Sequence, residues 1–255
     1  MGRDSLRFCL LQARNPGDLV REEECQAFAD RLGVQREAIQ GVDVLSQELG
    51  PHVLEGADAL LVGGAGEYSV CTPTPEIHNL MDFLGGVAED GLPVFASCFG
   101  FQCLVVALGG EVIHDAEGAE VGSSEVSLTE AGSRDPLFSF LPPRFVAQQG
   151  HKDRASRLPE ATVCLAENQN SPYQALRVKG RPVFATQFHP ELTGSTNRQR
   201  FERYIEHYGE VFGVNRARRM LEEFQPSPEA SGLLERFADW LVNERAQDGS
   251  EQAEQ

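Results

Sequence analysis

Two short segments of the sequence carry the side chains that a cysteine-dependent acyl transfer needs. Cys98 follows the apolar run at residues 93–96, and His189 and Glu191 follow a similar run at residues 182–186. A thiol, an imidazole and a carboxylate supply a nucleophile, a general base and a group that orients the base. The sequence therefore predicts that these three residues form one catalytic site.

The position of Cys98 is predicted to be a sharp turn from a strand into a helix. Small neighbours are needed at such a corner, and Ala96, Ser97 and Gly100 are small. The helix expected at residues 101–108 would point its N-terminus at the sulfur, where its partial positive charge stabilises a thiolate.

His189 and Glu191 lie two positions apart in a segment predicted to be extended, so their side chains point to the same side and can touch. Each piece alone has a commoner structural role. A single cysteine after a strand is usually a small buried hydrophobe, and a His-Pro-Glu tripeptide is usually a loop with a surface ion pair. Both segments follow strands in an alternating α/β pattern, where functional sites gather at the carboxyl ends of strands. The conjunction therefore favours a catalytic role.

A third segment, rich in glycine, follows the apolar run at residues 59–62. Gly63, Gly64 and Gly66 would allow backbone N–H groups to approach a ligand closely and to complete an oxyanion hole. The alternative is a simple flexible turn. A phosphate-binding role is disfavoured, because no Gly-Lys-Ser/Thr follows and the glycine spacing differs from a dinucleotide fingerprint.

Together these segments resemble the class I (triad-type) glutamine amidotransferase domain family, and most of all its free-standing GMP-synthase-glutaminase-like branch. The resemblance covers about residues 55–195, with three departures: the segment at residues 66–75, which differs from the synthase versions and bears on the substrate or partner, and two single residues. Ala96 stands where the family usually has glycine, and Ala65 stands where proline is common. Neither change removes a catalytic group.

The resemblance implies a role for each matching residue. Cys98 would be the nucleophile, His189 the base and Glu191 its orienter, with the Gly64 and Phe99 N–H groups as the oxyanion hole. Substrate-binding roles would fall to five further residues: Gly66, Gln102, Asn170, Ser171 and Tyr173. It implies no cofactor and no metal.

The pattern of apolar runs predicts an α/β protein: a flavodoxin-like three-layer sandwich with a mostly parallel central sheet. Helices are expected at residues 18–32, ending at Gly33, and at residues 75–89. Between residues 111 and 178 the runs become short strands, which predicts an added antiparallel region. A helix capped by Ser195 and Thr196 should follow the His-Pro-Glu segment and reach about Tyr208.

The expected organisation is one amidotransferase-like domain at residues 1–212, a C-terminal helical extension at residues 213–246 and a disordered acidic tail at residues 247–255. An apolar stripe in the extension, at residues 233–241, is expected to pack on the domain. The alternative for this stripe is a docking face for a partner or for a second copy of the chain.

Composition limits the possible partners. The 255-residue chain has a formal net charge of −17, which argues against nucleic acid and anionic membranes as partners. Its six cysteines show no paired or metal-ligating spacing, which favours reduced thiols. With no apolar signal segment and no run of membrane-spanning length, a cytoplasmic protein is expected.

The residues leave more than one function open. The first hypothesis is hydrolysis of the γ-amide of L-glutamine through a γ-glutamyl thioester, with ammonia passed to a separate synthetase, since the chain has no nucleotide-binding loop of its own. The second is a stand-alone hydrolase of γ-glutamyl peptides or conjugates. The third is a non-catalytic, metabolite-binding regulatory protein on the same scaffold, which would not need the complete triad. The sequence does not determine the oligomeric state.

Overall fold

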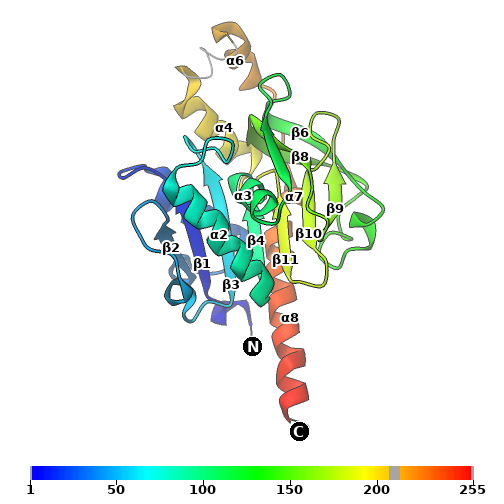
Figure 1. Ribbon diagram of the computed structural model, residues 1–255. Helices are drawn as coiled ribbons and strands as arrows, with labels where there is room; N and C mark the ends of the chain where they lie inside the picture. Colours follow the sequence, from blue (N-terminus) through cyan, green and yellow to red (C-terminus); the bar gives the residue numbers. More distant parts are fainter. Residues whose placement is uncertain (1, 207–212, 254–255) are drawn as a thin grey trace.

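A long mixed β-sheet forms the centre of the molecule (Figure 1). The computed structural model describes residues 2–206 and 213–253. Within these residues the main sheet has nine strands in the order β2-β1-β3-β4-β11-β10-β9-β6-β7, and β5 and β8 form a separate pair. The strands are β1 (Phe8–Ala13), β2 (Ile39–Asp43), β3 (Ala59–Ala65), β4 (Val94–Ser97), β5 (Glu111–His114), β6 (Glu120–Leu128), β7 (Arg144–His151), β8 (Asp153–Arg157), β9 (Thr162–Glu167), β10 (Ala175–Val178) and β11 (Val183–Thr186).

The sheet has a parallel half and an antiparallel half. Strands β2, β1, β3, β4 and β11 pair in parallel, whereas β10, β9, β6 and β7 continue the sheet in antiparallel pairs. The change occurs at the hairpin between β10 and β11, at the Lys179-Gly180 turn. This arrangement confirms the predicted α/β class with an added antiparallel region.

Helices cover both faces of the sheet, giving three layers (Figure 1). Helices α1 and α8 contribute Phe28 and Phe237 to one apolar core, and α2 and α3 contribute Leu80 and Leu104 to the other. Among the described residues, the helices of at least seven residues are α1 (Val20–Leu32), α2 (Pro75–Asp90), α3 (Phe99–Ala107), α4 (Gly194–Arg203), α6 (Val214–Met220) and α8 (Leu233–Ala253), and the short α7 spans Pro228–Ser231. As predicted, α1 ends at Gly33, which takes the left-handed conformation with φ of 68°.

The C-terminal helix α8 packs against β4 and β11, the two strands that lead to the candidate catalytic residues. The Phe237 ring lies 5.4 Å from Phe95 of β4 and 6.2 Å from Phe184 of β11, measured between ring centroids. Phe184 also contacts Trp240, at 5.8 Å. These edge-on and tilted aromatic contacts stabilise β4 and β11 on the face of the sheet that α8 covers.

Two expectations about helix ends are wrong. Thr193 caps α4, because its hydroxyl accepts a hydrogen bond from the Thr196 N–H and its own N–H donates to the Thr196 hydroxyl. The helix ends at Arg203, and Tyr208 lies outside the described residues. We expected residues 247–253 to be disordered, but helix α8 continues through them. Glu, Gln and Ala in this stretch favour helix, and no proline interrupts it. Residues 254–255 lie outside the described residues.

Candidate active site

The candidate nucleophile occupies a strained corner between β4 and α3. Cys98 has φ of 50° and ψ of −101°, and it is the one non-glycine residue with a positive φ in the part of the chain that the structure describes. Such a conformation costs about 1–3 kcal/mol and is characteristic of functional sites. A Cβ atom at Gly100 would lie only 2.7 Å from the Val62 carbonyl oxygen, so glycine allows α3 to start close to β3. The predicted turn is therefore present.

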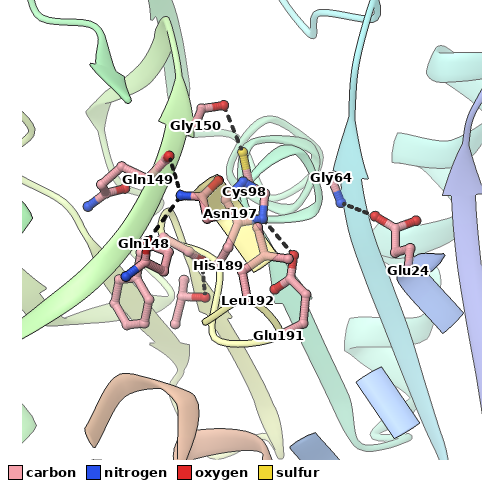
Figure 2. A network of polar contacts seen from close by, with 12 residues as sticks. Glu24, Gly64, Cys98, Gln148, Gln149, Gly150, His189, Glu191, Leu192 and Asn197 are labelled. Carbon is pink, nitrogen blue, oxygen red and sulfur yellow. Dashed lines mark hydrogen bonds and ion pairs between the residues drawn. The ribbon is translucent and has the colours of Figure 1, made fainter. Parts of the chain in front are cut away.

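The parallel pairing of three strands brings the candidate catalytic groups together. Strand β4 lies between β3 and β11 and runs parallel to both, so the carboxyl ends of all three strands meet at one edge. The Cys98 N–H donates to the Thr186 carbonyl at 2.7 Å, which extends the β4–β11 ladder to the nucleophile. Cys98 and His189 consequently face each other (Figure 2).

His189 and Glu191 form a close, buried pair. The distance from His189 Nδ1 to Glu191 Oε1 is 2.6 Å, and the two side chains are 7% and 0% exposed (Figure 2). A carboxylate can only accept here, so Nδ1 carries the proton and Nε2 is left as the nitrogen that exchanges a proton with the substrate. This is the geometry predicted from the His-Pro-Glu spacing.

The charges of the triad keep His189 protonated. Burial lowers the pKa of His189, but the negative charges of Cys98 and Glu191, and its hydrogen bonds to both, raise that pKa to about 10. Burial raises the pKa of Glu191, and the opposing charge and hydrogen bond of His189 bring it below its ordinary value. Near neutral pH the site therefore holds an imidazolium between two acidic partners.

The two predicted oxyanion donors differ in their surroundings. Phe99 is the first residue of α3, a position at which an N–H has no acceptor within its own helix. The Gly64 N–H instead donates to Glu24 Oε1 at 3.2 Å, and this bond runs away from Cys98 (Figure 2). Glu24 is fully buried and accepts from Arg14 Nη2 at 2.9 Å and from Gln12 Nε2 at 2.8 Å. An internal carboxylate therefore occupies one of the two donors.

Some of the predicted substrate-binding residues lie at the site. Gly66 lines a cavity of about 820 Å³ that has His189, Gly64 and Gly150 in its wall. The buried Gln102 side chain donates to the Asp153 carbonyl at 2.7 Å and to Gln187 Oε1 at 3.3 Å. Gln187 in turn directs its amide nitrogen to Cys98 Sγ at 3.9 Å, so Gln102 is one hydrogen bond removed from the nucleophile.

The other three predicted substrate-binding residues, Asn170, Ser171 and Tyr173, lie in the loop between β9 and β10. None of them is among the described residues that line the cavity beside His189. Asn168 organises this loop, because its side-chain oxygen accepts from the N–H groups of Asn170 and Ser171. The Ser171 hydroxyl is buried and has no partner among the described residues. Tyr173 packs against the core on the α2–α3 side of the sheet. Direct contact of these residues with substrate stays a prediction.

Sequence reasoning missed three charged residues near the site. Arg14 and Glu24 come from the end of β1 and from α1, and Arg200 comes from α4. Arg14 directly follows a buried strand, which is the same signal that identified Cys98 and could have been used. Nothing local in the sequence distinguishes Glu24 or Arg200 from the solvated face of a helix.

No group of metal-ligating side chains occurs in residues 2–206 and 213–253. Over the same residues, no helix combines the length and the apolar character that crossing a bilayer requires.

Comparison with known proteins identifies the family of this chain. The family model described as glutamine amidotransferase class-I matches residues 37–205. The glutamine-hydrolyzing GMP synthase of Thermosipho africanus is 36% identical over 107 residues, which are 42% of this chain and 20% of that protein. In Sulfurisphaera tokodaii the relative is one separate subunit of a glutamine-hydrolyzing GMP synthase, and it is 31% identical over 149 residues, which are 58% of this chain and 75% of that protein.

A solved structure shows the same fold. A glutamine amidotransferase from Thermotoga maritima superposes with a TM-score of 0.68 at 18% sequence identity, over 93% of this chain and 98% of that one. This likeness confirms the flavodoxin-like α/β sandwich. The match covers about a fifth of the length of the Thermosipho protein and three quarters of the Sulfurisphaera protein.

Proposed function

Because the chain belongs to the class-I glutamine amidotransferase family, we propose that it hydrolyses the γ-amide of glutamine through a thioester on Cys98. The observation that carries this proposal is the strained Cys98 facing a His189 whose Nδ1 lies 2.6 Å from Glu191. A complete, buried triad is costly to maintain, and a non-catalytic binding protein would not need it.

In the proposed reaction the Cys98 thiolate attacks the γ-carbonyl carbon, and the carbonyl oxygen becomes an oxyanion. The C–N bond then breaks as the His189 imidazolium gives its proton to the nitrogen, so that ammonia leaves. Water adds to the thioester carbon, with His189 now taking the proton from water. The C–S bond breaks and glutamate is released, which restores the thiolate and the imidazolium.

We propose that a separate protein receives the ammonia. The Sulfurisphaera relative is a separate chain of an enzyme named as a glutamine-hydrolyzing GMP synthase, whereas in the longer Thermosipho relative the matching region is part of one polypeptide. By analogy with the Sulfurisphaera relative, we expect the acceptor of the ammonia on another polypeptide.

The test is release of ammonia and glutamate from L-glutamine by the wild-type chain and by Cys98→Ala. We expect turnover in the wild type and loss of at least about a thousandfold in the variant, with a cooperative thermal transition that shows the variant is folded. Turnover that survives Cys98→Ala would contradict the proposal.

Alkylation with iodoacetamide near pH 7, followed by peptide mass analysis, provides an independent measurement that does not need turnover. We expect Cys98 to react first, because burial raises the pKa of the other thiols, to about 12 in Cys9 and to about 11 in Cys25 and Cys164. Equal or slower labelling of Cys98 would contradict the proposed thiolate nucleophile.

A further inference from the structure

The Cys98 sulfur lies among groups of opposite hydrogen-bonding character. Cys98 is 5% exposed, so a thiolate there depends on hydrogen-bond donors within the protein instead of on water. The Gly150 carbonyl oxygen lies 3.9 Å from Sγ and can only accept, so it favours a thiol and opposes a thiolate (Figure 2). His189 forms one hydrogen bond with the sulfur. The balance between thiol and thiolate therefore depends on any further donor that reaches Sγ.

Gln187 is a second side chain that reaches this sulfur. Its Nε2 atom lies 3.9 Å from Cys98 Sγ and donates a hydrogen bond to it. Gln187 directly follows β11, stands two positions before His189 and is fully buried. Its backbone N–H donates to the Gln174 carbonyl at 2.8 Å, which fixes the backbone from which the side chain extends. Gln187 and His189 thus approach the nucleophile from the same segment of the chain.

A chain of hydrogen bonds fixes which end of the Gln187 amide faces the sulfur. An amide side chain can turn either its oxygen or its nitrogen to a neighbour, and only the nitrogen donates. Gln102 Nε2 donates to the Asp153 carbonyl at 2.7 Å, and because a carbonyl only accepts, the Gln102 amide has one possible orientation. The same Nε2 also donates to Gln187 Oε1 at 3.3 Å. With its oxygen held there, Gln187 must direct its nitrogen to Cys98.

Asp153, at the start of this chain of hydrogen bonds, is held through both its backbone and its side chain. Its carboxylate accepts from the Ser69 hydroxyl at 2.5 Å and lies 2.8 Å from His114 Nδ1. Its carbonyl oxygen also lies 3.1 Å from Nδ1 of the buried His151. The carbonyl that orients Gln102 therefore belongs to a connected polar network, and such networks restrict the positions of their members.

We infer that Gln187 is a catalytic residue in addition to the triad: its side-chain N–H donates to the Cys98 sulfur and stabilises the thiolate. Gln102 is then the positioning residue that keeps this N–H directed to the sulfur. The inference rests on the proposed function and adds a role that His189 and Glu191 do not fill. In the thioester the sulfur is neutral. When water has added to the thioester carbon, the C–S bond breaks and its electron pair returns to the sulfur, where the Gln187 N–H stabilises the charge again.

The experiment follows the Cys98 thiolate in the full chain without any substrate. Gln187→Met keeps an unbranched side chain in the buried site and removes the N–H donor. We expect the pH profile of Cys98 alkylation by iodoacetamide to move to higher pH by about one unit. That shift is a tenfold change in the ratio of thiolate to thiol, which is close to the contribution of one hydrogen bond to a charged group. The ultraviolet absorbance of the thiolate, measured against Cys98→Ala, should follow the same profile.

Two further variants separate the role of Gln187 from a general effect of changing a buried glutamine. Gln102→Met leaves the Gln187 amide free to take either of two orientations, so the profile should move up by at most about 0.3 units, a factor of two. Gln174→Met is the matched control, because Gln174 is equally buried and its side chain bonds Glu120 at 2.8 Å and Gln149 at 3.0 Å. It should leave the profile unchanged.

Gln187→Asn is the second variant at the same position, because it keeps a polar amide in the buried site if methionine disrupts folding. Its side chain is one methylene shorter, too short to bond Gln102 and reach Sγ at once, so the profile should again move to higher pH. A profile that stays at the wild-type position in a folded Gln187 variant, or that moves equally in Gln174→Met, would overturn the inference. Failure of the proposed function would instead appear as glutamine hydrolysis that survives Cys98→Ala.

Discussion

The two strands that flank the candidate nucleophile present their polar groups in opposite ways. On the β11 side, His189 and Glu191 already form a pair at 2.6 Å. On the β3 side, the Gly64 N–H is directed to Glu24 and away from Cys98 (Figure 2). Both strands lie in parallel register with β4, so the difference does not come from the sheet. It comes from the side chain that each strand end meets.

In the proposed mechanism, this difference separates two tasks of the site, proton transfer and stabilisation of the oxyanion. The base side is assembled without substrate, whereas the oxyanion side has one donor at the start of α3 and one donor bound to an internal carboxylate. For Gly64 to stabilise an oxyanion, its N–H has to leave Glu24. Glycine at positions 63 and 64 permits such a rotation of the peptide groups, because no side chain restricts it. We therefore expect proton transfer to depend on the β11 side and acylation to respond to the β3 side.

The largest effect is expected from the base side. Glu191→Gln removes the charge that orients His189, and we expect kcat for glutamine to fall about a thousandfold. In the wild type, activity should hold through neutral pH and decline above about pH 10, because His189 then loses the proton that the leaving amine needs. Without the Glu191 charge the pKa of His189 falls, so this decline should move to lower pH. A pH profile of kcat/KM for both proteins measures the shift.

The sign of this pH effect follows from the direction of the shift. A histidine pKa that folding raises above its ordinary value of 6.5 stabilises the protein fully below that value, and the stabilisation disappears as pH rises through about 10. Thermal unfolding of the wild type should therefore move to lower temperature between these two pH values, and less so for Glu191→Gln. An unchanged pH profile in the variant would contradict the assigned pairing.

A smaller effect of the opposite sign is expected from the oxyanion side. Glu24→Gln replaces a charged acceptor of the Gly64 N–H by a weaker neutral one, so the amide can turn to the substrate more readily. We expect Cys98 acylation to become about fivefold faster, corresponding to about 1 kcal/mol. Pre-steady-state release of ammonia measures this step.

Glu24→Gln also carries a cost in stability that serves as a check. Glu24 and Arg14 form a buried ion pair at 2.9 Å, and loss of one charge leaves the guanidinium with only Asp18 at 4.0 Å. We expect the free energy of unfolding to fall by about 3 kcal/mol, so acylation is compared at a temperature where both proteins are folded. Slower acylation in the variant would show that the contact supports the active geometry instead of opposing it.

The same contrast explains what could be predicted from the sequence. Cys98, His189 and Glu191 could be predicted from the sequence because each follows a strand, and parallel strands bring their carboxyl ends to one edge. Glu24 could not be predicted from the sequence. It lies 40 positions before Gly64 on α1, and its contact with β3 depends on how that helix packs across the sheet.

Helix ends also depended on contacts that the sequence pattern does not contain. Thr193 caps α4 through a reciprocal bond with Thr196, and Ser195 and Thr196 were equally plausible by residue type. The β3 strand continues to Ala65, so Gly63 and Gly64 belong to the strand and only Gly66 follows it. The neighbouring Val62 and Ala65 pair with β1, and the Gly64 N–H bonds to Glu24, and both contacts are distant in sequence.

The smallest effect is expected from Gln148, which holds the backbone of His189 in place. The Gln148 side chain is fully buried and donates to the Gln225 carbonyl and to the Ser227 hydroxyl, both at 3.0 Å, and its backbone carbonyl accepts from the His189 N–H at 2.9 Å. It thus connects the segment before α7 to the backbone that carries the base. Gln148→Leu removes the side-chain bonds but keeps the backbone bond, and we expect kcat to fall about fivefold with little change in KM.

Gln225→Ala is the matched control for this prediction, because Gln225 takes part through its backbone N–H and carbonyl groups. It should leave kcat unchanged. If both variants lose activity equally, the C-terminal segment acts through general stability and the base side needs no specific support. If Gln148→Leu alone loses activity, the ordered state of His189 depends on a contact that lies more than thirty residues beyond the triad in sequence. The position of His189 would then depend on the segment before α7, whereas the Gly64 N–H depends on Glu24 of α1. Two separate segments, each distant in sequence, would thus control the two sides of the site.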